Sequence, residues 1–179
     1  MSEQSVLAWH FLPDDEHLRF GECIKPEVGQ VLRHPGELIL CEKGFHASLK
    51  PLDALSYAPG SVLCRVRMSG EILYGDDKLD ASERTILWKR NVEDVLHEFA
   101  CQCAEDVLHL IPEPERPVFA AAIAAKRAWL QHEISDAELS AAWAAAWAAA
   151  CAAGSAAAWA AARAAQNIRL EIMIERVTQ

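Results

Sequence analysis

The sequence predicts an α+β protein, with a β-rich module over residues 1–90 and a helical, alanine-rich region over residues 91–179 packed on it. Three observations support this fold class. The first part contains short apolar runs separated by Pro, Gly and Asp, which is typical of strands and turns. After Asn91 the apolar spacing changes to the helical period of 3.6 residues. From residue 139 to 162 the chain is mostly alanine without a charged side chain, and alanine is the strongest helix former.

Apolar and β-branched runs of the first part predict the strands. "SVLAWHFL" at 5–12 is closed by a turn, and two shorter runs within 29–48 flank "HPGE", which predicts a turn or hairpin there. "SVLCRVRMSGEILYG" at 61–75 alternates apolar and basic residues, as expected for a strand with one face in water. "ERTILWKR" at 83–90 is the last predicted strand. Between these runs, "PLDALSYAPG" at 51–60 begins with proline and predicts a short helix of two turns.

Start signals divide the second part into helices. Asn91 is a good N-cap for a helix over 92–111, and Pro117 begins a second helix. Ser135 and Glu138 form a capping box for a third. That helix could extend to about Arg176, roughly 60 Å at 1.5 Å per residue. Because Gly154-Ser155 in its middle is a place for a kink or reversal, the sequence leaves open one rod or two packed helices.

Charge and composition exclude several classes of protein. The net charge of −9 and the isoelectric point near 5.2 argue against nucleic-acid binding, which needs a basic face. The six cysteines follow a start without a signal peptide, so we expect a reduced, cytoplasmic protein. The uncharged stretch is long enough to cross a bilayer, but alanine gains little from lipid and no basic cluster flanks the stretch. We therefore expect no membrane partner.

Tryptophans are the notable side chains of the alanine-rich stretch. Trp143 and Trp147 are one helical turn apart, and Trp159 continues the same four-residue spacing. Each indole can bury a large area, while the alanines allow a neighbour to come close. An exposed helix of this kind would leave a large apolar patch. We expect the three tryptophans to be binding residues that are buried within the chain, in a homodimer or against a protein partner.

Residues with chemical potential occur at three places in the first part. His10 is near the end of the first strand, "GFHAS" at 44–48 precedes the short helix, and Glu83 opens the last strand. This order resembles the layout of ADP-ribosyltransferase folds. The resemblance implies that His10 contacts the ribose of NAD, that Phe45 or His46 lies beside the nicotinamide ring, and that Glu83 binds the ribose hydroxyl. Phe45 and Ser48 are predicted to be binding residues. A carboxylate there would stabilise the positive charge that develops as nicotinamide leaves. The alternative is that His46 only caps or hydrogen-bonds the turn between strand and helix.

Two further resemblances concern interaction proteins. "CEKGFHAS", "PLDAL", "SGEI" and "LHEFACQCAE", followed by the alanine-rich tail, are similar to a group of uncharacterised bacterial and phage proteins with a GFHA-type N-terminal module. Residues 97–135 also resemble the helical domains of predicted immunity proteins, which neutralise toxins by binding. We therefore expect a small cytoplasmic protein of phage or prophage type that binds a defence or toxin component and needs no cofactor. The alternative is an enzyme that uses NAD through His10, His46 and Glu83.

A metal site is not predicted. His97 and Cys101 are four residues apart on one helix, and Glu105 and His109 continue the row, a spacing that can hold zinc. Cys103, however, points to another face, and the chain contains no pair of cysteines separated by two residues. The row is better explained as a solvated polar stripe.

Overall fold

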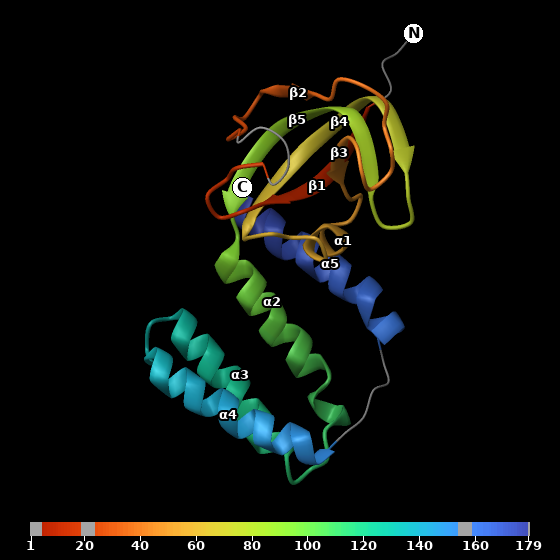
Figure 1. The fold of residues 1–179 in the computed structure, drawn as a ribbon. Helices are drawn as coiled ribbons and strands as arrows, with labels where there is room; N and C mark the ends of the chain where they lie inside the picture. The colour runs from red at the N-terminus through yellow and green to blue at the C-terminus, as the bar shows by residue number, and fades with distance from the viewer. Residues whose placement is uncertain (1–4, 19–23, 154–158, 179) are drawn as a thin grey trace. The chain divides into compact units, whose positions relative to one another are not determined.

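The chain divides into two compact units in the computed structural model, which describes residues 5–18, 24–153 and 159–178. Residues 1–93 together with 170–179 form the first, which we call the sheet unit, and residues 94–169 form the second, the helical unit. The strands and α-helices of both units are labelled in Figure 1. The predicted mixture of α and β structure is confirmed. The last residues of the chain belong to the unit that contains the strands.

Five antiparallel strands make up the sheet, with the order β1-β4-β5-β2 and with β3 also paired to β5. Strands β4 and β5 form a long hairpin; the predicted strands 5–12 and 61–75 each extend one residue beyond β1 and β4 at one or both ends, and 83–90 lies within β5. The bounds are β1 Val6–Leu12, β2 Val31–Arg33, β3 Phe45–Ala47, β4 Val62–Tyr74 and β5 Leu79–Asn91. The short helix α1, Pro51–Leu55, begins at the predicted proline.

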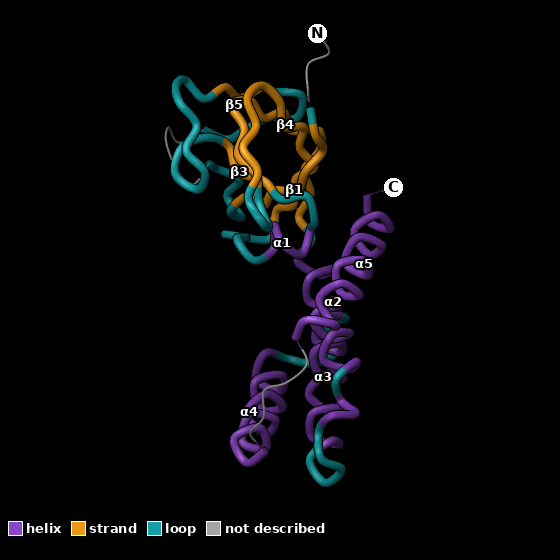
Figure 2. The backbone as a smooth tube through the Cα atoms, turned by 90° about the vertical axis from the view of Figure 1, so that its right-hand side faces the viewer, coloured by secondary structure: helices purple, strands orange, loops and turns teal. Residues whose placement is uncertain are grey.

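Strand β5 is shared between two short partners. Its residues 79–81 pair with β3, and residues 83–85 pair with β2. Directly after β3, Ser48 exchanges two backbone hydrogen bonds of 2.8 and 2.9 Å with Trp9 of β1. The strands therefore curl around a common interior, which Figure 2 shows nearly end-on.

The two apolar runs around "HPGE" do not pair with each other, so a hairpin at this place is wrong. The first run is β2, whose partner is β5. The second run is a tight loop in which Ile39 bridges to Lys43. Cys41 has a φ of 70° and Gly44 a φ of 129°, and such left-handed conformations interrupt a strand.

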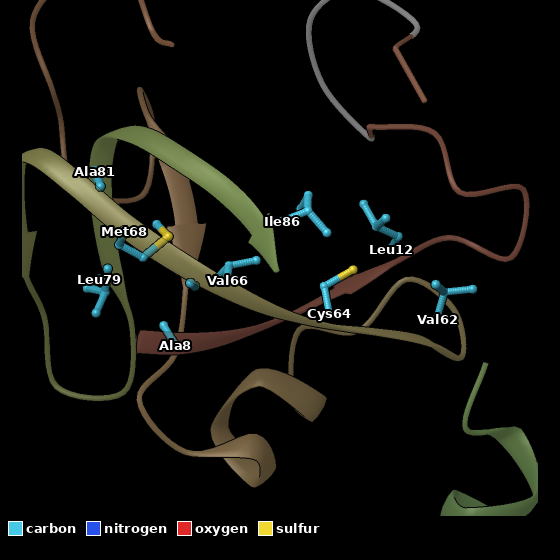
Figure 3. Packing of buried hydrophobic residues seen from close by; sticks show 10 residues of the cluster. Ala8, Leu12, Val62, Cys64, Val66, Met68, Leu79, Ala81 and Ile86 are labelled. Atoms are coloured by element: carbon cyan, nitrogen blue, oxygen red, sulfur yellow. The ribbon is translucent and has the colours of Figure 1, made fainter. Parts of the chain in front are cut away.

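Apolar side chains from all strands but β2 fill the interior of the curled sheet (Figure 3). Inward and outward positions alternate along a strand, so β1 sends Ala8 and Leu12 inward and Trp9 to the opposite face. The buried cluster consists of Ala8, Leu12, Ala47, Val62, Cys64, Val66, Met68, Leu79, Ala81 and Ile86. Each fully buried aliphatic side chain of this kind stabilises the fold by about 2 kcal/mol.

Aromatic and helical residues belong to the opposite face. The rings of Trp9 and Trp88 meet edge to face at 5.9 Å, and the Arg65 guanidinium lies 4.2 Å from the Trp9 ring. In helix α5, Trp159–Thr178, both Leu170 and Ile174 are fully buried.

The helical unit contains α2 (Glu93–Asp106), the short 3-10 helix η1 (Leu108–Leu110), α3 (Arg116–Leu130) and α4 (Asp136–Ala153). The predicted start signals are present. The Asn91 carboxamide oxygen accepts a hydrogen bond of 2.8 Å from the Glu93 N–H. Ser135 and Glu138 form the reciprocal capping box, since each backbone N–H donates to the other's side chain, at 2.8 and 3.4 Å.

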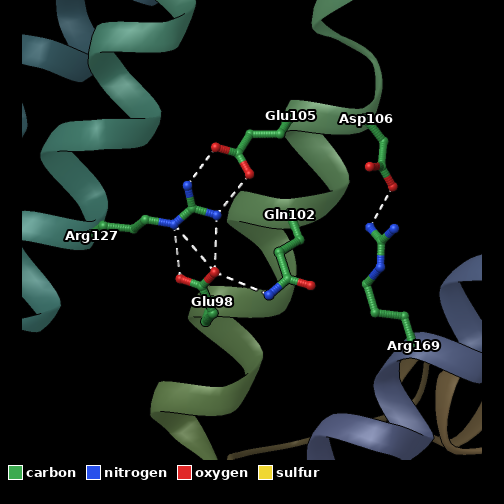
Figure 4. Close-up of polar contacts among 6 residues, drawn as sticks. All are labelled: Glu98, Gln102, Glu105, Asp106, Arg127 and Arg169. Atoms are coloured by element: carbon green, nitrogen blue, oxygen red, sulfur yellow. Dashed lines mark hydrogen bonds and ion pairs between the residues drawn. The ribbon is translucent and has the colours of Figure 1, made fainter.

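Small residues and one arginine hold these helices together. Ala122 of α3 and Ala146 of α4 are both buried, and alanines allow the two helices to approach closely. Between α2 and α3, Arg127 donates hydrogen bonds to both Glu98 and Glu105 (Figure 4). The predicted third helix appears as α4 and α5, and the Gly154-Ser155 position between them lies outside the described residues. No described helix is both long and apolar enough to cross a membrane.

Candidate functional site

A buried arginine lies in the interior of the sheet unit. Arg84 of β5 faces Met68 of β4 in the register, and its exposed fraction is only 2%. Its Nη1 donates to the His46 carbonyl at 3.2 Å, and its guanidinium lies 5.0 Å from the centre of the Phe45 ring. The Nε atom finds no acceptor among the described residues. Burial lowers the Arg84 pKa to about 10, so the group stays charged at neutral pH.

His10 of β1 shares this interior with Arg84. Its pKa is well below 6.5, because burial disfavours the imidazolium and because the positive charges of Arg84 and His46 oppose it. A hydrogen bond to the His46 backbone partly offsets this lowering of the His10 pKa. The His10 ring is therefore neutral at pH 7, and it lies next to a buried cation.

His46 contacts a buried carboxylate. Its Nε2 is 3.2 Å from Oδ1 of Asp80, which has no exposed surface. The geometry of that contact is not that of a hydrogen bond, so Oδ1 accepts none from a described residue. The other oxygen, Oδ2, accepts the Cys41 N–H at 2.7 Å. Burial lowers the His46 pKa, and the Asp80 charge opposes this shift.

Glu83 is engaged elsewhere. Its Oε1 accepts from Arg33 Nε at 3.0 Å, and its Oε2 accepts from the Ser69 hydroxyl at 3.3 Å. Along β5 it is three residues from Asp80, roughly 10 Å at 3.3 Å per residue. The structure thus brings His10 and His46 together, while Arg33 and Ser69 hold the Glu83 carboxylate.

Asp80 and Arg84 were not singled out by the sequence. Both lie within ordinary strand and turn patterns, and only the pairing of β3 with β5 places Asp80 opposite His46. An arginine next to glutamate in "ERTILW" is expected to be a solvated residue, so no signal marks its burial.

The other predicted residues of the sheet unit have structural contacts. Phe45 is partly buried against the apolar cluster and meets the His34 ring edge to face at 6.5 Å. Ser48 is 2% exposed and makes the two backbone hydrogen bonds to Trp9 described above.

Trp143 lies on the surface of α4, with 55% of its area exposed. Next to it, Ala144 and Ala145 are also exposed, whereas Ala146 is buried. The side chains of Trp147 and Trp159 lie outside the described residues. In the same unit, the His97 ring packs edge to face on Trp129 at 5.8 Å, and Cys101 is buried. Within the described ranges, no three His, Cys, Asp or Glu side chains gather as a metal site would require.

The fold and these residues define a protein with a curled antiparallel sheet unit and a separate helical unit. Comparison with known families adds that residues 15–98 match the model of a domain of unknown function, DUF7666. No curated protein and no solved structure matches the chain. The matched stretch includes His46, Asp80, Glu83 and Arg84, begins after His10, and ends within α2. It assigns no activity to these residues.

Proposed function

We propose that this protein acts by binding a protein partner through the outer side of α4. The observation that carries the proposal is the 55% exposure of Trp143 on a helix that bears no charged residue after Glu138. Tryptophan is enriched at protein interfaces, where it often contributes a large share of the binding energy.

The packing of α4 leaves part of its described surface, up to residue 146, exposed. Its inner side contacts α3, where buried Ala146 allows the helices to approach. Exposed Ser140, one turn before the indole on the same face, and exposed Ala144, directly after it, are both small. They would allow a partner backbone to come close while the indole enters a pocket of that partner.

The resemblances to phage proteins and to immunity-protein helices support a toxin or defence component as the partner. A second copy of the chain is the alternative occupant. A cytoplasmic location is part of the proposal, and the free thiols Cys41, Cys64 and Cys101 support it, since thiols persist in reducing compartments.

Photo-crosslinking tests the proposal. A benzophenone amino acid is placed at position 143 or, as a matched control, at Tyr74, which is 53% exposed in the sheet unit. We expect a crosslinked product of one defined mass from position 143 and none from position 74. Excess unlabelled chain should prevent the product, whereas excess chain carrying Trp143→Arg should not.

The mass of the product identifies the occupant, since a product of twice the chain mass means a homodimer. Equal crosslinking at both positions, or equal competition by the Trp143→Arg chain, would contradict the proposal.

The NAD-dependent alternative has weaker support. It requires a carboxylate that is free to meet the ribose beside His10 and His46, and Glu83 is bound by Arg33 and Ser69. The acid next to His46 is Asp80, which is fully buried. Protection from thermal unfolding by NAD, lost in Glu83→Gln, would favour this alternative over the binding function.

A further inference from the structure

We propose that Arg84 is the receptor for a phosphate group in the interior of the sheet unit, with His10 as a second contact. The observations are the 2% exposure of Arg84, the unsatisfied Nε and the absence of a carboxylate beside its guanidinium among the described residues. This site lies in the sheet unit and does not depend on the proposed role of α4.

Three other arginines of the described chain have carboxylate partners, unlike Arg84, whereas Arg65 and Arg116 each also have one buried nitrogen without a described acceptor. Arg33 pairs with Glu83, Arg127 with Glu98 and Glu105, and Arg169 with Asp106. Those three side chains keep 69%, 30% and 33% of their surface exposed. Arg84 is the most buried of the four, and its one described hydrogen bond is to a neutral carbonyl. Leaving a buried charge without a partner destabilises a protein by several kcal/mol.

The described neighbours of Arg84 do not supply a counter-charge. Burial raises the pKa of the Cys64 thiol to about 12, so Cys64 is neutral, and His10 is neutral as well. Of the acids along β5, Glu83 binds Arg33 and Ser69, and the oxygens of Asp80 face the Cys41 N–H and His46. A bound anion would supply the missing charge.

The geometry around the guanidinium suits an oxyanion. Nη1 already donates to His46, while Nε remains free to donate, and arginine recognises phosphate oxygens through such N–H groups. Phosphate fits better than a carboxylate because His10 can gain a proton and match a second negative charge. The Phe45 ring covers the guanidinium on one side and strengthens the attraction by excluding water.

Solvent can approach this interior near two rings. His10 and Phe45 are each only partly buried. The Phe45 ring contacts the Arg84 guanidinium, and the Arg84 charge lowers the His10 pKa.

The first test uses wild-type protein and inorganic phosphate. The His10 ring signals, assigned by comparison with His10→Gln, are titrated by NMR with and without phosphate at equal ionic strength. Bound phosphate should raise the His10 pKa by about 1 unit, because a nearby anion stabilises the imidazolium. Sodium chloride should have no such effect. An unchanged His10 pKa at saturating phosphate would overturn the proposal.

The second test uses thermal unfolding. Phosphate at about 100 times its Kd should raise the Tm of the wild type by roughly 5–10 °C. Arg84→Met should abolish this increase while raising the Tm in phosphate-free buffer, because an apolar chain of similar length replaces an unpaired buried charge. Arg33→Met, which removes an exposed arginine on neighbouring β2, should keep the phosphate effect. An equal phosphate effect in Arg84→Met would mean binding elsewhere on the surface and would refute the site.

If Arg84→Met does not fold, Arg84→Lys replaces it. Lysine keeps the charge but loses the planar N–H pair, so we expect phosphate to bind at least 10-fold more weakly. Undiminished affinity in Arg84→Lys would contradict recognition by the guanidinium.

Discussion

His46 and Asp80 face each other across the β3–β5 ladder, with Nε2 of the histidine 3.2 Å from Oδ1 of a carboxylate that has no exposed surface. The second oxygen of Asp80, Oδ2, accepts a hydrogen bond of 2.7 Å from the Cys41 N–H. Cys41 is in the left-handed conformation, with a φ of 70°, so Asp80 holds the loop at the point where its backbone is least favourable. The pair thereby links the 39–44 loop to the sheet.

The histidines should make the protein less stable in mild acid. The pKa values of His10 and His46 are lowered in the folded chain, so the unfolded chain binds protons more readily below its own value of about 6.5. The two histidines contribute to the free energy of unfolding above pH 6.5. This contribution is lost as the pH falls from 6.5 through the pKa values of the folded chain. Over this pH range, each such histidine can lower the free energy of unfolding by up to about 1.4 kcal/mol per pH unit. His10→Gln should flatten the decline in urea unfolding between pH 6.5 and 5, and the exposed control His109→Gln should not. Parallel curves for His10→Gln and wild type would contradict this.

Arg127 should stabilise the contact between α2 and α3. Its guanidinium binds both Glu98 and Glu105 and lowers the pKa of each carboxyl (Figure 4). Because these groups are partly exposed, we expect Arg127→Met to reduce the free energy of unfolding by only about 1 kcal/mol at pH 7. The contribution is present above about pH 4.5 and is lost as the pH falls through the lowered pKa values. Variant and wild type should therefore converge in acid. A constant difference down to pH 3 would show that lost packing, not charge, is responsible.

Gly70 should be hard to replace. Its φ is 76°, it lies at the bulge of β4, and a Cβ atom would overlap the Ser82 hydroxyl that accepts the Glu71 N–H. Gly29 has a similar φ of 85° with open space around it. We expect Gly29→Ala to cost about 1 kcal/mol for the left-handed backbone and Gly70→Ala roughly 1–2 kcal/mol more for the lost hydrogen bond. Chemical denaturation measures both. Equal losses would mean that Ser82 moves aside without consequence.

Thiol labelling should distinguish the cysteines. Cys41 is exposed, whereas Cys64 is fully buried with a pKa raised to about 12. Iodoacetamide at pH 8 should modify Cys41 at least about 100-fold faster than Cys64, because only an accessible thiolate reacts. Peptide mapping by mass spectrometry gives the two rates separately. Comparable rates in the native protein would show that the sheet unit opens readily.

Much of the local structure could be predicted from the residues. Pro51, Pro117 and the Ser135–Glu138 box start helices because they satisfy or remove the free N–H groups of a first turn. The long β4–β5 hairpin follows from alternating apolar residues around a turn. For the candidate sites, the sequence pointed to His10, His46 and the tryptophans, but it could not say which of them share an interior.

The sequence by itself determined where helices and most strands begin and which half of the chain contains each, because periodicity, propensity and capping act over a few residues. Tertiary structure alone decided that β2 and β3 both pair with β5, that Asp80 lies opposite His46, and that Arg84 is buried while neighbouring Glu83 remains paired with Arg33. These outcomes depend on strand register between segments distant in the chain. A shift of one residue in register exchanges the inner and outer faces of a strand, and no local pattern encodes that choice for a charged residue.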